Sequence, residues 1–138
     1  MNASDTKPTI AAGATESAIQ GSPAVDFDAL LERVENDTTL LEDMIGLYLD
    51  SSPRLLTEIE SGVQRQDAQA IQRAAHALKG ALQNLSAGPS AETALALEKM
   101  GRAGDLKSAD CTLVELKGEL DRLQAELQSW SKETVGQA

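Results

Sequence analysis

The sequence predicts an all-α protein, an up-down antiparallel four-helix bundle with a short extra helix on its N-terminal side. Apolar residues make up 41% of the 138 residues but aromatic residues only 2%, so the core must be built from Leu, Ala, Ile and Val. That composition favours helices over a β-sandwich or barrel. Apolar residues also recur at helical spacing from Phe27 to Trp130, and no segment has the pattern of a strand.

The first two predicted helices lie between Phe27 and Val63. Apolar residues from Phe27 to Val34 follow the i, i+3, i+4, i+7 rule, which predicts a short helix. Asp37 is suited to cap a second helix, whose apolar pattern continues to Val63. Pro53 interrupts this pattern, and a proline kinks or restarts a helix because it removes an N–H and crowds the preceding turn. We therefore expect one long, bent helix.

Three more helices are predicted in the second half of the chain. Asp67 is suited to cap the first of them, Gly88-Pro89 is a helix breaker with Ser90 as the next cap, and Gly104-Asp105 marks a turn. The final helix carries an apolar stripe from Leu106 to Trp130, with steps of three and four residues that suit bundle packing. The core stripe of the helix after Asp67 consists of Ile71, Ala75, Leu78, Leu82 and Leu85.

The predicted domain covers residues 25–131. Residues 1–24 are rich in Ala, Ser, Thr, Gly and Pro without apolar periodicity, so we expect a flexible tail or linker there. Residues 132–138 are expected to form a flexible C-terminal tail. No apolar run approaches the ~18 residues of a membrane span, and residues 1–24 lack the pattern of a signal peptide. We expect a cytoplasmic monomer without membrane insertion.

Charge and cysteine content exclude several classes of function. The formal net charge of −10 argues against nucleic-acid binding, which needs a basic face. The single cysteine, Cys111, excludes an intramolecular disulfide and a Cys-based zinc site, and we interpret it as a small, partly buried residue. A solvated helix face is the expected role of Glu115, Glu119, Asp121 and Glu126.

The chain's only histidine, His76, is predicted to lie on the solvent side of its helix. With about 100° per residue, its side chain lies about 140° from Ile71, well off the core stripe. Its helical neighbours are Gln72, Lys79, Gly80 and Gln83, none of which is a large apolar residue. The segment from residue 65 to 85 is also mildly basic, with Arg65, Arg73 and Lys79 against Asp67. A partner with an acidic site would be steered there.

Each neighbour of His76 has a chemical interpretation and a structural one. Lys79 can counter the charge of an attached phosphoryl group, but a lysine at this spacing is also common on a solvated helix. Gly80 leaves space for a partner, or it reflects close helix packing. Gln72 and Gln83 can hydrogen-bond the ring or a partner. The residues alone leave these alternatives open.

The segment from His76 to Ala87 resembles the signature H-x-x-K-G-x-x-x-N-L-G-A of histidine phosphotransfer (HPt) domains, the helical-bundle modules of bacterial two-component phosphorelays. His76, Lys79 and Gly80 match its first part, and residues 84–87 match its second. The resemblance covers roughly residues 25–131. Ser86 departs from the pattern because it stands where a glycine is usual.

The resemblance implies a role for each matching position. His76 would accept the phosphoryl group, Lys79 would support that group, and Glu98 on the next helix would hydrogen-bond the ring, with Gln83 as a further supporting residue. Gly80 would give a receiver domain access, with Gln72 and Arg73 beside it on the landing surface. Leu82, where a small polar residue is often found, lies on the core stripe.

The implied function is a phosphocarrier that exchanges a phosphoryl group with the aspartate of receiver domains in response regulators or hybrid histidine kinases. Mg²⁺ is expected only on the receiver, and the chain itself would need no cofactor or metal. It has no Gly-rich nucleotide loop, so we expect neither kinase nor phosphatase activity. The alternative is a non-phosphorylated helical adaptor that binds signalling partners through the same surface. A histidine-based metal site lacks partner ligands, since His76 is the only histidine.

Overall fold

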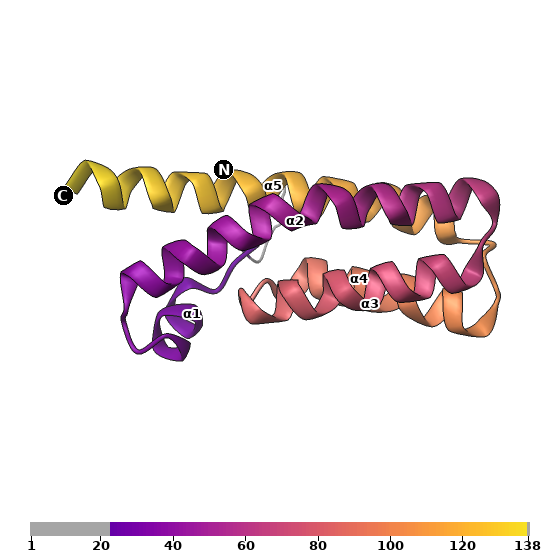
Figure 1. The fold of residues 1–138 in the computed structure, drawn as a ribbon, viewed down its shortest axis with the longest axis horizontal. Helices are drawn as coiled ribbons and strands as arrows, with labels where there is room; N and C mark the ends of the chain where they lie inside the picture. The colour runs from indigo at the N-terminus through magenta and orange to yellow at the C-terminus, as the bar shows by residue number, and fades with distance from the viewer. Residues whose placement is uncertain (1–22, 138) are drawn as a thin grey trace, which may run out of the picture.

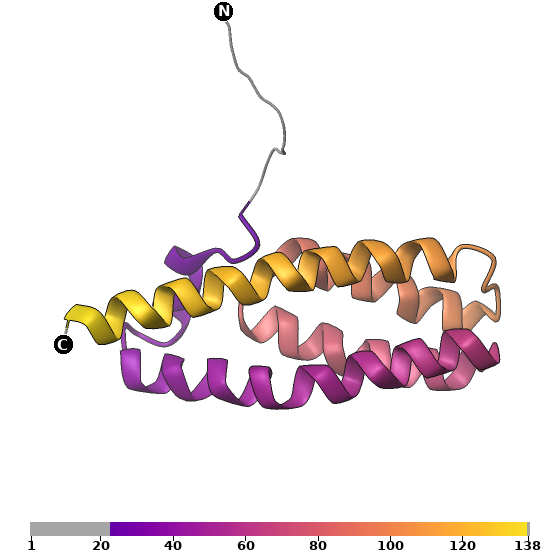
Figure 2. The same ribbon diagram turned by 90° about the horizontal axis from the view of Figure 1, so that it is seen from above.

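The computed structural model describes residues 23–137, with side chains described from residue 23 to residue 130. In this part of the chain five helices are joined by short loops, and there is no strand. Four long helices lie side by side, and a short helix packs near the end of the bundle where the last helix projects (Figures 1 and 2). The predicted all-α bundle with an extra N-terminal helix is therefore confirmed. The helices are α1 (Phe27–Arg33), α2 (Thr38–Arg65), α3 (Ala68–Asn84), α4 (Gly88–Ala103) and α5 (Ala109–Gln137).

Aspartate side chains cap the first three helices. Asp37 accepts a hydrogen bond from the backbone N–H of Leu40 at 3.0 Å at the start of α2, as predicted. Asp67 does the same for Ala70 at 3.1 Å at the start of α3. Helix α2 continues through Pro53 to its end, and Figure 1 shows that it changes direction near its middle. The expectation of one long, bent helix is confirmed.

The turn after α3 explains the usual glycine of the HPt signature. Ser86, which occupies that position, has a φ of 55°, in the left-handed region that glycine adopts most readily. The backbone N–H of Ala87 donates to Leu82 across this turn at 2.9 Å. Serine therefore adopts the conformation that the turn requires, at a conformational cost, and the end of the histidine helix is preserved.

Helix α4 begins earlier than predicted. We expected Gly88-Pro89 to break the chain and Ser90 to cap the helix, but the helix starts at Gly88 with Ala87 as its N-cap. A proline in the first turn is tolerated, because its missing N–H would have no intrahelical partner there. Ser90 is instead buried, with its hydroxyl 3.4 Å from the carbonyl of Ala87.

Helix α5 differs from the prediction at both ends. It begins at Ala109, so Leu106 precedes the helix and packs half-buried against the core from the connecting loop. At the other end the helix continues to Gln137, into the segment from residue 132 for which the sequence predicts a flexible tail. No proline interrupts this stretch, and the backbone hydrogen bonds of the helix continue through it.

The N-terminal junction of the domain is held by Glu126. The backbone N–H groups of Ala24 and Val25 donate to its two carboxylate oxygens at 2.9 and 3.1 Å. Both residues are buried, so the domain begins before the predicted boundary at residue 25; residues 1–22 of the expected tail lie outside the described part. Glu126 is consequently half-buried rather than part of a solvated face. Nearby, Phe27 stacks on Trp130 with ring centroids 6.2 Å apart.

Two further expectations about α5 are wrong. Cys111 is exposed, because it lies on the side of α5 that faces away from the bundle. Glu119 is half-buried beside Thr93 of α4, and this burial raises its pKa. Glu115 and Asp121 are exposed, as expected for a solvated face.

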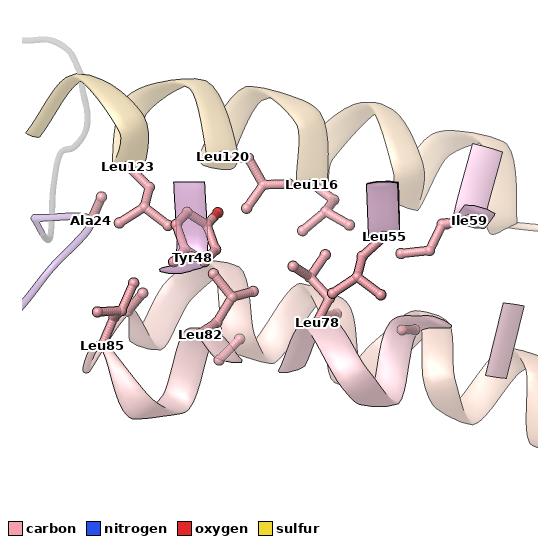
Figure 3. Close-up of a cluster of buried hydrophobic side chains, with 14 of the residues drawn as sticks. Ala24, Tyr48, Leu55, Ile59, Leu78, Leu82, Leu85, Leu116, Leu120 and Leu123 are labelled. Carbon is pink, nitrogen blue, oxygen red and sulfur yellow. The ribbon is translucent and has the colours of Figure 1, made fainter. Parts of the chain in front are cut away.

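The core fills the space between the long helices. Figure 3 shows Leu78 and Leu82 of α3, and Leu85 directly after it, pointing toward α5, where Leu116, Leu120 and Leu123 lie, with side chains of α2 between them. The predicted core stripe of α3 is buried throughout, and Ala74 is buried with it. Burial of one side of α3 leaves its opposite side, which carries His76, facing outward.

Candidate functional site

His76 lies in the middle of α3, and its side chain is 67% exposed. Its neighbours Ala75 and Leu78 are both fully buried, because they point to the core side of the same helix. The helical periodicity therefore places the imidazole correctly on the solvent side.

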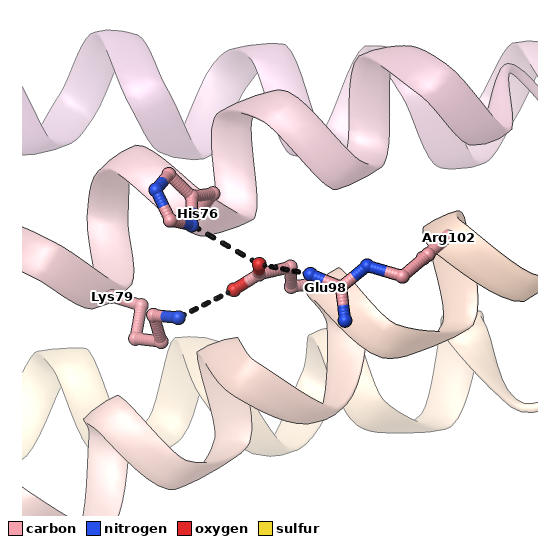
Figure 4. A network of polar contacts seen from close by, with 4 residues as sticks. All are labelled: His76, Lys79, Glu98 and Arg102. Atoms are coloured by element: carbon pink, nitrogen blue, oxygen red, sulfur yellow. Dashed lines mark hydrogen bonds and ion pairs between the residues drawn. The ribbon is translucent and has the colours of Figure 1, made fainter.

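Beneath the ring lies a buried carboxylate. Glu98 of α4 is only 3% exposed, and its Oε2 atom is 3.0 Å from Nδ1 of His76 (Figure 4). An ionised carboxylate can only accept hydrogen bonds, so Nδ1 carries the proton and donates it to Glu98. The other ring nitrogen, Nε2, points away from Glu98 in Figure 4. The hydrogen bond at Nδ1 thus leaves Nε2 with its lone pair directed outward.

Two cations hold the carboxylate of Glu98. Nζ of Lys79 is 2.8 Å from Oε1, and Nη2 of Arg102 is 2.7 Å from Oε2, the oxygen that also binds His76. The Lys79 side chain is 17% exposed, whereas that of Arg102 is 57% exposed. The site is therefore a four-residue network in which every contact runs through one buried carboxylate.

The network keeps Glu98 ionised. The hydrogen bond from Lys79 lowers the pKa of Glu98 below its ordinary value of 4.5. Burial of the carboxylate raises the pKa, but the hydrogen bond from His76 lowers it further, and the net shift is downward. The carboxylate therefore remains a hydrogen-bond acceptor throughout the neutral pH range.

This shift predicts how acid affects stability. A group whose pKa is lowered by folding stabilises the folded state above its unfolded pKa, and this contribution is lost as the pH falls through the folded value. The advantage of the wild type over a Glu98→Gln variant in free energy of unfolding should therefore shrink as the pH falls below 4.5. Urea unfolding of both proteins over a pH series checks this. A difference that stays constant into acid would show that the Glu98 charge does not contribute.

A glycine brings α3 and α4 close enough for the network to form. An added Cβ on Gly101 of α4 would lie 2.6 Å from the carbonyl oxygen of Ala68 and 2.7 Å from the backbone nitrogen of Gln72, both in α3. The two backbones are therefore nearly in contact one turn from His76. This approach lets the Glu98 side chain, three residues before Gly101, reach the ring.

The other predicted site residues lie around His76 without joining the network. No atom lies within 4 Å of an added Cβ on Gly80, so helix packing does not require this glycine. Arg73 is exposed and lines a groove between α2 and α3. Gln72 is half-buried next to Gly101, which places it at the helix interface. Gln83 is exposed, and its backbone carbonyl accepts a hydrogen bond from Arg33 at 2.9 Å.

Two residues of the site were missed in the sequence. Arg102 stands four residues after Glu98, the spacing of an ion pair on one helix face, but the signal is weak because such pairs are common. Gly101 stands inside a predicted helix, where a glycine costs about 1 kcal/mol relative to alanine and so calls for a structural reason. Both signals gain meaning only once α3 and α4 are known to be neighbours.

The described residues offer little for other chemistries. Among the side chains that the structure describes, in residues 23–130, no group of three or more His, Cys, Asp or Glu is arranged to hold a metal ion. In the same part of the chain, none of the helices combines the length and the apolar character that crossing a membrane requires.

A helical bundle that exposes one histidine above a buried acceptor has the architecture of a helical phosphotransfer domain. The sequence model of the Hpt domain family matches residues 43–126, more than half of the chain. The chain therefore belongs to the Hpt domain family. Members of this family are phosphocarriers of two-component signalling and have no kinase or phosphatase activity of their own, and the same holds for this chain.

A solved structure has the same fold. The crystal structure of histidine-containing phosphotransfer protein B (HptB) from Pseudomonas aeruginosa PAO1 superimposes with a TM-score of 0.76 and is 22% identical in sequence. The match covers 82% of this chain and 98% of that protein. A search of curated proteins found no sequence match. At this identity the similarity establishes the fold.

Proposed function

We propose that His76 accepts a phosphoryl group from the aspartate of one receiver domain and donates it to the aspartate of another. The receivers would belong to response regulators or hybrid histidine kinases of a phosphorelay. The observation that supports this most is the orientation of the ring: Nδ1 is held by Glu98 at 3.0 Å, and the side chain is 67% exposed with Nε2 facing outward.

This geometry supports the following transfer step. The lone pair of Nε2 attacks the phosphorus of the aspartyl phosphate, the N–P bond forms, and the P–O bond breaks with its electrons leaving on the aspartate carboxylate. Such a reaction depends on positioning and charge stabilisation more than on acid–base steps. The ring keeps its Nδ1 proton and becomes positively charged, and the Glu98 carboxylate lies where it stabilises that charge. The reverse reaction passes the group to the next receiver.

Lys79, Gln83 and the receiver are proposed to supply the other groups that the transfer needs. Lys79 orients Glu98 and places positive charge next to the ring, where it favours an attached phosphoryl group. Gln83 lies further along the same helix and is proposed as a polar contact for the phosphoryl group or the partner. Mg²⁺ would be held by the receiver, so this chain would supply the nucleophile and the docking surface and need no cofactor.

The docking surface is proposed to centre on Gly80, with Arg73 and Gln72 beside it. The absence of neighbouring atoms around Gly80 leaves room for a receiver to approach the ring. Arg73 is exposed and adds positive charge for an acidic receiver site. We further propose a monomer in the cytoplasm; the exposed, free thiol of Cys111 supports the location, because it suits a reducing compartment.

A transfer experiment tests this function. Receiver domains carrying labelled phosphate are mixed with the chain, and the label on the chain is tested for stability in acid and alkali. We expect one phosphoryl group per chain, lost in acid and retained in alkali, because the chain has a single histidine. A receiver that binds the chain but transfers no label to it would support the adaptor function instead.

The Gly80→Gln variant tests whether Gly80 gives the receiver access to His76 or serves helix packing. A bulky side chain at this position would obstruct the receiver, so transfer should slow by about tenfold or more, which corresponds to ~1.4 kcal/mol in the barrier. Since an added Cβ meets no atom, the melting temperature should stay the same or rise. A quenched time course of label transfer measures the rate, and thermal melting measures the stability. Transfer at the wild-type rate would show that the receiver does not approach over Gly80.

A further inference from the structure

The buried carboxylate beneath His76 poses a chemical problem for the proposed function, on which this inference rests. A lone ionised carboxylate 3.0 Å from an imidazole favours the protonated, positively charged ring. A protonated ring has no lone pair on Nε2 and cannot attack phosphorus. A contact that orients the nucleophile therefore also tends to inactivate it, unless the charge of the carboxylate is offset.

Arg102 is placed to offset that charge. Its guanidinium binds Oε2 of Glu98 at 2.7 Å, the oxygen that accepts the proton of Nδ1 at 3.0 Å. Lys79 binds the other oxygen at 2.8 Å, so the single negative charge is shared by two cations before His76 is counted (Figure 4). With both cations present, the carboxylate orients the ring as a hydrogen-bond acceptor and exerts less attraction on a second ring proton.

We propose that Arg102 is a positioning residue of phosphotransfer, which acts through Glu98 to limit the attraction of that carboxylate for a second ring proton and so to keep Nε2 of His76 nucleophilic. The backbone supports this placement. Gly101, the residue before Arg102, lies against the backbone of α3. This contact fixes the position of α4 relative to α3, and with it the position of Arg102 relative to the ring. Arg102 also lies four residues after Glu98, where side chains on one helix face meet.

The charged groups around His76 come from three helices. Those nearest the ring lie on α3 and α4, whereas the charges of α2 lie across a groove on the other side of α3, where Arg54 and Glu58 pair with each other at 3.1 Å. The charged side chains of α3 are Arg73 and Lys79, and those of α4 are Glu92, Glu98, Lys99 and Arg102, of which Glu92 and Lys99 are exposed. Among the described residues, Glu98 is the negative charge that contacts the ring, so the cations bound to Glu98 determine how strongly it attracts a ring proton.

The test compares Arg102→Gln with Arg102→Lys and with Arg122→Gln, which removes an exposed arginine of α5 as a matched control. Because His76 is the only histidine, its ring protons give a single titration curve in an NMR spectrum, without any partner protein. We expect the midpoint of this curve to move up by about one pH unit in Arg102→Gln. Arg102→Lys should restore most of the wild-type curve, and Arg122→Gln should leave it unchanged.

Transfer from a labelled receiver gives the second readout. In Arg102→Gln the acid limb of the pH–rate profile should move up with the ring titration, while the rate at alkaline pH approaches that of the wild type. In a Glu98→Gln background, the Arg102→Gln change should shift neither curve, because the carboxylate that links the two residues is gone. An equal shift in that background would contradict the proposal.

The experiments can contradict the role of Arg102 and the proposed phosphotransfer separately. If the ring titration of Arg102→Gln coincides with that of the wild type, Arg102 is only a surface ion pair and the inference is wrong, whatever the transfer rates. If the titration moves as expected but no receiver phosphorylates the wild type, the proposed phosphotransfer is wrong and the electrostatic role of Arg102 stands.

Discussion

Replacing His76 with glutamine is expected to abolish acid-labile phosphorylation of the chain while leaving the bundle folded. The chain has no second histidine that could take over as acceptor. The side chain is 67% exposed and contributes nothing to the apolar core, so the free energy of unfolding should change by about 1 kcal/mol or less. The glutamine amide can also donate to Glu98 in place of Nδ1–H. Label transfer and urea unfolding of the variant measure the two effects.

The outcomes discriminate between roles of His76. A variant that melts far below the wild type would show that the ring is structural. A folded variant that still takes up acid-labile label would place the acceptor elsewhere. A folded variant that binds receivers but takes up none is the result expected of a phosphocarrier that has lost its nucleophile.

Gly101→Ala is expected to cause the largest loss of stability. The added methyl group would lie 2.6–3.0 Å from backbone atoms of Ala68 and Gln72, which cannot move aside as a flexible side chain can. The helices must separate, and overpacking of this kind costs about 1–3 kcal/mol. This cost exceeds the gain of up to about 1 kcal/mol that alanine brings to a helix interior. The variant should therefore melt below the wild type although alanine is the better helix former.

Gly80→Ala is the matched control for this change. It adds the same methyl group to a helical glycine, but at a position where no atom lies within 4 Å. Its melting temperature should stay the same or rise. Separation of α3 from α4 in Gly101→Ala should also draw Glu98 away from His76 and slow transfer. Equal melting of the two alanine variants would show that the close approach at Gly101 does not constrain the bundle.

The sequence predicted those features that depend on one helix at a time. The caps at Asp37 and Asp67 and the exposure of His76 follow from local hydrogen bonding and helical periodicity, which need no knowledge of the neighbours. The start of α4 was missed because Pro89 suits both a helix break and a first helical turn. The end of α5 was missed because polar residues after Trp130 give no apolar periodicity, although the backbone remains helical.

The features that depend on two helices needed the structure. The buried state of Glu98 results from the close approach of α3 and α4 at Gly101, which no pattern within either helix reports. The HPt resemblance pointed to Glu98 as a partner of the ring, but not to Arg102 on the same oxygen. Similarly, the sequence of α5 alone predicts Glu126 as a surface residue, because the hydrogen bond from the distant Ala24 is visible only in the structure.

In the proposed function, the Nε2 atom of His76 carries the phosphoryl group while Nδ1 keeps its proton, which it donates to Glu98. NMR spectroscopy of the isotope-labelled chain, phosphorylated by a receiver, locates the group on the ring directly. We predict a phosphorus–nitrogen coupling at Nε2 and a proton on Nδ1 that is protected by its hydrogen bond. A phosphoryl group on Nδ1, or on any residue other than His76, would contradict it.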